Sequence, residues 1–246
     1  MLRNAVDRRI LDRIERSLSD LFQNYADVPA SEFEHHLASS DPVERDFWEQ
    51  IKLSHIFDRT FRTVAGISYF DIVHNSGLSD FAACAFPDSE VTESTVCNSR
   101  RIADSELHQL WDKPIEFHVD AQFFNDDRLS INFWTPLVPC GVDAPGLKVI
   151  SLGVGETRAY LEHSAEGYPR GPNDIAFMHK FRCRKMKLPE LAENDLLKYV
   201  WAPEFNMGDV LAFTNFTMHA THYTPMMRRP RTSVEVRIDL PGYHLR

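Results

Sequence analysis

Apolar side chains recur with a helical period in the first part of the chain and with a strand period in the rest. Over most of residues 1–24, large aliphatic residues return every three or four positions, which predicts an amphipathic helix. The capping-box spacing that begins at Ser31 predicts a short second helix. Asp41-Pro42 is a helix start, and the apolar stripe after it predicts a third helix that ends at Gly66. A helical layer is therefore expected over residues 1–66.

From residue 67 onward the pattern changes to short β-type runs separated by turn residues. Helices first and many short strands later indicate a mainly β (α+β) fold, a β-sandwich or jelly roll with the N-terminal helices packed outside. The strands are expected at residues 67–73, 80–86, 115–124, 129–137, 147–154, 210–213, 216–223 and 232–240.

No glycine- or serine-rich linker divides the chain, so residues 1–246 are expected to form a single domain. Its jelly-roll core is assigned to residues 67–154 and 208–240. The intervening residues 155–207 show little strand pattern and contain a basic run at residues 179–187. Unpatterned segments longer than about 12–15 residues inside compact domains are usually functional. This insertion is therefore predicted to be a lid or binding loop, and the alternative is a flap that only covers the sheet.

Composition narrows the partners that the protein can have. The net charge of -9 argues against a nucleic-acid backbone as a partner, and no apolar run is long enough to span a membrane. The four cysteines lack CxxC spacing, so neither a zinc site nor a disulfide framework is indicated. Reduced thiols and a charged N-terminus without a signal peptide favour a cytoplasmic location. The expected partner is a small-molecule substrate, and the expected assembly is a monomer or homodimer.

The first candidate for chemistry is the pair His118 and Asp120, in the centre of the strand predicted at residues 115–124. Alternate residues of a strand share one face and lie roughly 7 Å apart along the chain. Two histidines and one carboxylate on one side of an ion form the facial triad of non-haem Fe(II) oxygenases. One His-x-Asp is a weak signal by itself, because a chain with 11 histidines is expected to contain about one by chance.

The second half of the candidate site lies near the C-terminus. His219, on the strand predicted at residues 216–223, would supply the second imidazole. Arg231 and Ser233 lie two positions apart on the next predicted strand and therefore face the same side. Together they could bind a carboxylate, to which the arginine would donate bidentately.

These segments occur together in one chain, and the combination is much more specific than any one of them. The matching motifs are His118-Val119-Asp120, Asn132-Phe133-Trp134-Thr135-Pro136-Leu137, Gly146-Leu147, Gly208-Asp209-Val210-Leu211-Ala212-Phe213 leading to His219, and Arg231-x-Ser233. In these motifs the chain resembles the phytanoyl-CoA dioxygenase family of Fe(II)- and 2-oxoglutarate-dependent oxygenases. The resemblance covers residues 115–154 and 205–240. It does not extend to the N-terminal half, and Lys148-Val149-Ile150-Ser151 stands where the family often has a Pro-Gly-Ser-His-like stretch.

The resemblance implies a double-stranded β-helix core, also called a cupin-like jelly roll. It implies that His118, Asp120 and His219 are the catalytic residues and hold Fe(II). It further implies that Arg231, assisted by Ser233, binds the distal carboxylate of 2-oxoglutarate, and that Trp134 and Thr221 line the pocket of this cosubstrate. His222 competes with His219 as the distal ligand. We prefer His219, because its spacing fits the family and because His222 would point to the opposite face of the strand.

The activity implied by the resemblance is that of a non-haem iron dioxygenase. Such an enzyme uses O2 and 2-oxoglutarate to hydroxylate, desaturate or cyclise a small-molecule metabolite at an unactivated C–H bond, and it releases succinate and CO2. The carboxylate at Asp120 favours hydroxylation over halogenation, because halogenases of this type carry a small residue there. The alternatives are a cupin-type metalloenzyme without 2-oxoglutarate and a non-catalytic jelly-roll binding protein.

Overall fold

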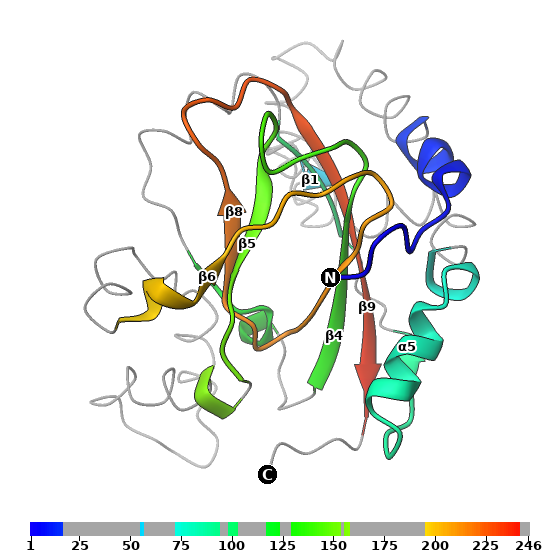
Figure 1. The fold of residues 1–246 in the computed structure, drawn as a ribbon. Helices are drawn as coiled ribbons and strands as arrows, with labels where there is room; N and C mark the ends of the chain where they lie inside the picture. Colours follow the sequence, from blue (N-terminus) through cyan, green and yellow to red (C-terminus); the bar gives the residue numbers. More distant parts are fainter. Residues whose placement is uncertain are drawn as a thin grey trace, which may run out of the picture.

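The computed structural model describes residues 1–16, 55–56, 72–93, 98–102, 117–123, 129–153, 155–157 and 195–241 (Figure 1). The helix predicted from Ser31 lies outside these residues. The helix predicted from Asp41 to Gly66 also lies outside them except at His55–Ile56, where it is wrong, because these two residues form a short strand. Most of the predicted insertion, from residue 158 to residue 194, lies outside the described part as well. Among the described residues, no helix is both long and apolar enough to cross a bilayer.

Two antiparallel sheets form the centre of the structure. The larger sheet has the order β1 (His55–Ile56), β3 (Asn98–Ile102), β9 (Arg231–Leu240), β4 (Leu129–Pro136) and β7 (Leu211–Thr214), and β2 (Thr92–Glu93) also pairs with β9. The smaller sheet has the order β6 (Val200–Trp201), β5 (Gly146–Ile150) and β8 (His219–His222). The protein is therefore mainly β in its described part, as the sequence predicts.

Strand alternation separates a polar and an apolar face on the larger sheet. On β9, the even-numbered residues from Val234 to Leu240 belong to a buried apolar cluster. The odd-numbered residues from Arg231 to Asp239 are polar, and two of them contact groups outside the large sheet: Arg231 bonds to β5, and Arg237 bonds to Asp120. The polar face of β9 thus lies inside, between the sheets. Apolar residues close the same space: Trp134, Cys140, Ala144, Leu147, Val149, Phe205, Leu211 and Phe213.

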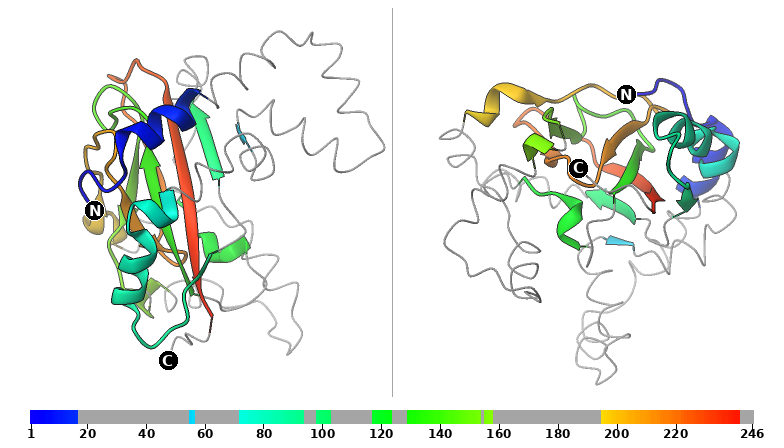
Figure 2. Two further views of the ribbon diagram at one scale, coloured as in Figure 1. Left: turned by 90° about the vertical axis from the view of Figure 1, so that its right-hand side faces the viewer. Right: turned by 90° about the horizontal axis from the view of Figure 1, so that it is seen from below.

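The outer face of the larger sheet is covered by helices (Figure 2). Residues 8–16 form the N-terminal helix, and α5 (Leu78–Ala85) lies beside it. Asp7 caps the N-terminal helix, because its Oδ1 accepts a hydrogen bond of 2.8 Å from the backbone N–H of Arg9. Burying an aliphatic side chain stabilises the fold by roughly 1.5–3 kcal/mol. The helices contribute Ile10, Leu11, Ile14, Leu78 and Ala82 to the cluster that β4 and β9 complete.

The predicted N-terminal helix begins later than expected. Residues 1–7 are not helical, because Leu2 pairs with Val210 in an antiparallel bridge with N–O distances of 2.8 and 2.9 Å. This long-range pairing satisfies backbone groups that a helix starting at residue 1 would leave open at its first turn. The helix predicted from the aliphatic period is nevertheless confirmed over residues 8–16. Residues 17–24 lie outside the described part.

Two predicted strands are wrong. Residues 72–75 and α5 are helical, where the sequence analysis placed strands at 67–73 and 80–86. Residues 67–71 lie outside the described part. In α5, three alanines supply high helix propensity, and Leu78 and Ala82 lie four apart on one buried face. Short apolar runs are ambiguous between helix and strand, and here the helical propensity prevails.

The later strands are confirmed with small shifts of their ends. β4 and β9 match the predicted runs 129–137 and 232–240 to within a residue at each end. β5, β7 and β8 lie within or beside the predicted runs 147–154, 210–213 and 216–223. The short strands β1, β2, β3 and β6 were not predicted. β6 lies within the predicted insertion and extends the smaller sheet, so this end of the segment belongs to the core.

The outer face of the smaller sheet buries a lysine. Lys148 is 7% exposed and lies opposite Ala220, whose neighbours in a second apolar cluster include Phe117 and Ile150. Its Nζ lies 5.3 Å from the centre of the Phe117 ring. Burial lowers the pKa of Lys148 to about 8. Desolvation of the charged amine therefore outweighs its attraction to the aromatic ring.

We expect Lys148→Met to stabilise the protein at pH 7 by about 1–3 kcal/mol, because a folded-state pKa about 2.5 units below the ordinary value of 10.5 costs roughly 3 kcal/mol. Between pH 8 and 10.5 the unfolded state binds more protons, so the wild type gains stability with rising pH and the advantage of the variant shrinks. Urea unfolding at pH 7 and pH 10 measures this difference. Lys198→Met is the control, because Lys198 is exposed and pairs with Asp195. Equal destabilisation by Lys148→Met at both pH values would contradict the prediction.

Candidate metal centre

His118 and Asp120 are placed by a bridge and a turn, not by one continuous strand. His118 pairs with His219 in an isolated antiparallel bridge with N–O distances of 3.0 and 2.9 Å. The chain then turns into the 3-10 helix η1 (Asp120–Phe123), where the N–H of Ala121 donates to the carbonyl of Asn215 at 2.8 Å. The strand predicted at 115–124 is therefore wrong after His118; its ends, residues 115–116 and 124, lie outside the described part.

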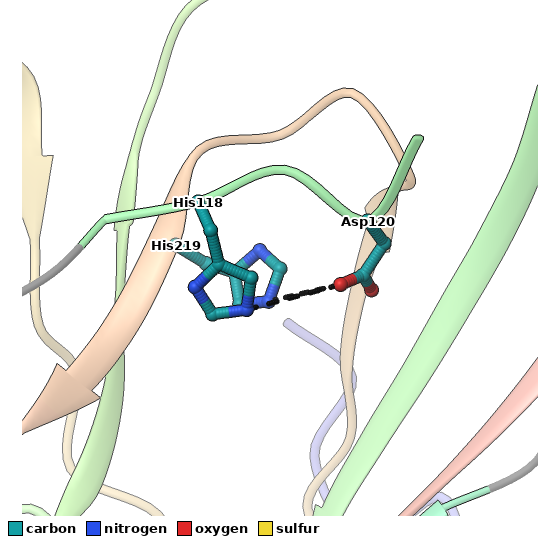
Figure 3. A group of neighbouring side chains, drawn as sticks. All are labelled: His118, Asp120 and His219. Atoms are coloured by element: carbon teal, nitrogen blue, oxygen red, sulfur yellow. Dashed lines mark ion pairs between the residues drawn. The ribbon is translucent and has the colours of Figure 1, made fainter. Parts of the chain in front are cut away.

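The turn nevertheless brings together the three residues that the sequence analysis assigned to a metal (Figure 3). Asp120 Oδ1 lies 3.9 Å from His118 Nε2 and 3.6 Å from His219 Nε2. One ligand atom from each residue lies within 4.8 Å of the other two. The two imidazole rings are 4.2 Å apart between centroids and are tilted by 53°. Asp120 and His219 are buried, whereas His118 is partly exposed.

A hydrogen bond fixes the orientation of His219. Its Nδ1 lies 2.9 Å from the carbonyl oxygen of Thr217. A carbonyl oxygen only accepts, so Nδ1 carries the proton of this hydrogen bond, and Nε2 is the nitrogen that faces Asp120 Oδ1. Histidines that bind metals in proteins are held in this way by a hydrogen bond from the other ring nitrogen. The local structure thus prepares His219 as a ligand.

Asp120 uses its two oxygens for different contacts. Oδ1 faces the imidazoles, whereas Oδ2 accepts hydrogen bonds from Asn132 Nδ2 at 2.5 Å and from a terminal guanidinium nitrogen of Arg237 at 2.8 Å. Burial by itself raises the pKa of Asp120, but the positive charges of His219 and Arg237 outweigh it, so the pKa is lowered overall. The carboxylate is therefore ionised and ready to bind a cation.

Sequence reasoning assigned no role to three members of this environment. Asn132, Glu235 and Arg237 are buried or nearly buried beside Asp120, and Arg237 also donates to Glu235 at 3.0 Å. The alternation of β9 carried a signal, because Glu235 and Arg237 continue the face that holds Arg231 and Ser233. Asn132 lies within a motif that was matched as a whole. The sequence pattern could not show that these residues lie beside Asp120, because Asp120 and Arg237 are more than a hundred residues apart in the chain.

The predicted carboxylate-binding residues also lie on the inner face. Arg231 is 2% exposed, donates to the carbonyl of Gly146 at 3.1 Å, and has its guanidinium carbon 5.3 Å from the centre of the Trp134 ring. Ser233 is likewise 2% exposed and follows Arg231 on the same face of β9. Trp134 packs against the ring of Phe205 with centroids 4.9 Å apart. The structure thus places a cation, a hydroxyl and an indole on one inner wall.

β8 separates the two histidines that competed as the distal ligand. Thr221 lies on the same face of β8 as His219 and pairs with Leu147, which belongs to the cluster between the sheets. His222 pairs with Gly146 and lies on the opposite face of β8 from His219. It is not part of the His118–Asp120–His219 group. Burial and the nearby charge of Lys148 lower the pKa of His222. These placements favour His219 over His222.

Comparisons with known proteins identify a shared fold but no family. No family model matches the sequence, and no curated protein is similar enough to match. The fold is shared with EctD from S. alaskensis. Its structure with 2-oxoglutarate and 5-hydroxyectoine has a TM-score of 0.56 at 13% identity, over 98% of this chain and 71% of EctD. The structure of EctD with bound Fe has a TM-score of 0.52 at 13% identity, over 98% and 72%.

A weaker likeness joins the chain to EvdO2 from Micromonospora carbonacea var. aurantiaca complexed with 2-oxoglutarate. The TM-score is 0.48 at 14% identity, over 78% of this chain and 68% of EvdO2.

Proposed function

We propose that the chain is a non-haem Fe(II)- and 2-oxoglutarate-dependent dioxygenase on a double-stranded β-helix core. The observation that carries this proposal is the convergence of His118, Asp120 and His219 on the inner face, with their ligand atoms within 4.8 Å of one another. The shared fold with EctD, whose structures contain Fe and 2-oxoglutarate, supports the identity of the metal and the cosubstrate.

The residues fit a divalent iron. Two imidazoles and one carboxylate on one side of the ion leave its other positions open for a cosubstrate and O2. Two adjacent ligand atoms on a metal with bonds of about 2.1 Å lie roughly 3 Å apart. The separations of 3.6 and 3.9 Å around Asp120 Oδ1 are within about 1 Å of that value. Small side-chain movements therefore suffice to close the triad on an ion.

Arg231 is the proposed anchor of 2-oxoglutarate. Its buried guanidinium can pair with the distal carboxylate of the cosubstrate, and the Ser233 hydroxyl can donate a further hydrogen bond. Trp134 lies against Arg231, and Thr221 lies on the same face of β8 as His219. Trp134 and Thr221 are therefore proposed to line the cosubstrate pocket. The hydrogen bond from Arg231 to Gly146 restricts the orientation of the guanidinium before the cosubstrate binds.

The iron, when bound with 2-oxoglutarate and O2, supplies the oxidising power to attack an unactivated C–H bond, with release of succinate and CO2. The protein orients the reactants and excludes water through the apolar residues between the sheets, including Leu147, Val149 and Phe213. We propose hydroxylation of a small-molecule metabolite, or the related desaturation or ring closure, as the reaction. Residues 155–207 are proposed to help enclose the substrate.

The test is turnover of 2-oxoglutarate by the purified protein. We expect slow succinate formation and O2 consumption that require both Fe(II) and 2-oxoglutarate, even without the substrate. Under anaerobic conditions, addition of 2-oxoglutarate to the Fe(II) protein should produce a visible charge-transfer band. Metal binding without any response to 2-oxoglutarate would instead identify a metalloenzyme that does not use this cosubstrate. Absence of metal binding would leave a non-catalytic binding protein.

A further inference from the structure

A buried polar network holds the oxygen of Asp120 that faces away from the histidines. Asp120 Oδ2 accepts from Asn132 Nδ2 at 2.5 Å and from Arg237 at 2.8 Å. Arg237 also donates through Nε to Asn132 Oδ1 at 2.5 Å. The three side chains therefore form a closed ring of hydrogen bonds in which each touches the other two. Glu235 lies outside the ring and accepts from Arg237 at 3.0 Å.

The ring is built on rigid supports. Asn132 and Arg237 are directly opposite each other on the paired strands β4 and β9. Asn132 is 0% exposed and Arg237 is 5% exposed. Because the guanidinium is a planar fork with fixed donor directions, its Nε and terminal nitrogen can engage Asn132 and Asp120 at the same time. The carboxylate of Asp120 therefore has little freedom to rotate about its Cβ–Cγ bond.

This arrangement decides which oxygen can reach a metal. Both hydrogen-bond donors act on Oδ2, whereas both imidazole Nε2 atoms lie nearest to Oδ1. A carboxylate that bound an ion through both oxygens would have to give up the bonds from Asn132 and Arg237. Breaking bonds to a buried charged group is costly. The network thus opposes bidentate coordination.

We propose that Asn132 and Arg237 are positioning residues that reserve Oδ2, so that Asp120 binds the metal through Oδ1 alone. This inference rests on the proposed function and deepens it, because a carboxylate that takes one position on the metal leaves another position open for reactants. Arg237 also places a positive charge 2.8 Å from Oδ2. The network therefore holds the carboxylate of Asp120 in one orientation beside the histidines.

The experiment compares Asn132→Ala and Arg237→Lys with the wild type by anaerobic titration with Co(II) alone, followed by the visible spectrum of the bound ion. Loss of a residue that orients a metal ligand typically weakens metal affinity by about 10–100-fold. We expect a loss of this size in both variants, together with a changed spectrum, because Asp120 can then rotate and bind through both oxygens. Arg237→Lys keeps the positive charge but removes the planar guanidinium that bonds to Asn132 and Asp120 at the same time.

Ser130→Ala is the matched control. Ser130 precedes Asn132 on the same face of β4, is buried, and opposes Asp239 in the sheet. We expect Co(II) affinity and spectrum of this variant to equal those of the wild type. Melting temperatures of the metal-free proteins separate a loss of stability from a loss of positioning. If Arg237→Lys does not fold, Asn132→Ala decides the question, because it keeps the buried ion pair.

The outcomes distinguish this inference from the function on which it rests. Wild-type Co(II) affinity and spectrum in a folded Asn132→Ala protein would overturn the positioning role and leave the proposed function intact. A wild-type protein that does not bind Co(II) would overturn the proposed function and the positioning role together. A weakened affinity with an altered spectrum, and an unchanged Ser130→Ala protein, would support the inference.

Discussion

His219→Ala is expected to abolish Fe(II) binding and 2-oxoglutarate turnover, whereas His222→Ala leaves metal binding largely intact. The reason is geometric. His219 Nε2 lies 3.6 Å from Asp120 Oδ1, and its Nδ1 is held by the carbonyl of Thr217. His222 lies on the other face of the short strand β8 and pairs with Gly146. Removal of a direct ligand should weaken metal affinity by more than the roughly 100-fold that loss of a supporting residue can cause.

Anaerobic metal titration and succinate release measure the two effects of these substitutions. His222→Ala is a matched control, because it removes the same side chain from the same strand. Thermal unfolding of both metal-free variants shows whether either substitution disturbs the fold. A His222→Ala protein that loses the iron, beside a His219→Ala protein that keeps it, would show that the distal ligand has been assigned to the wrong histidine.

Arg231→Ala is expected to raise the apparent constant for 2-oxoglutarate by two or more orders of magnitude. Removing one partner of a buried ion pair costs on the order of 3–5 kcal/mol, and each 1.4 kcal/mol corresponds to about tenfold in affinity. Arg231 is 2% exposed and its guanidinium is directed by its bond to Gly146, so its removal would leave the bound carboxylate without this buried partner. Co(II) affinity should stay near the wild-type value, because Arg231 is not a ligand.

The dependence of succinate release on 2-oxoglutarate concentration measures this effect. Arg228→Ala serves as the control, since Arg228 is exposed and its guanidinium bonds to the carbonyl of Pro225. Near-normal constants are expected for that variant. Normal 2-oxoglutarate affinity in Arg231→Ala would remove the arginine from the cosubstrate site.

The features that follow from local periodicity could be predicted from the sequence. Alternation along β9 placed Arg231 and Ser233 on one face, and both are buried there. The same rule separated His219 from His222 on β8. β4 and β9 were found to within a residue at their ends, because long runs with a clear strand pattern are the least ambiguous signals.

Local pattern failed where a short apolar segment suits more than one conformation. α5 was predicted as a strand, although its alanines favour a helix that packs Leu78 onto the outer face of the large sheet. The start of the N-terminal helix was placed too early, because the pairing of Leu2 with Val210 joins residues that are far apart in the sequence. Such pairings depend on the assembled sheet, and no local period records them.

The candidate site shows the same division. By itself the sequence determined which residue types could bind a metal and a carboxylate, since His118, Asp120, His219 and Arg231 stand out by their spacing. Only the tertiary structure decided how they meet. A turn stabilised by Asn215 replaces the expected strand after His118 and aims Asp120 at the histidines. The contact of Arg237 with Asp120 likewise exists only in the folded chain, because hydrogen bonds between residues distant in sequence form when the strands that carry them pair.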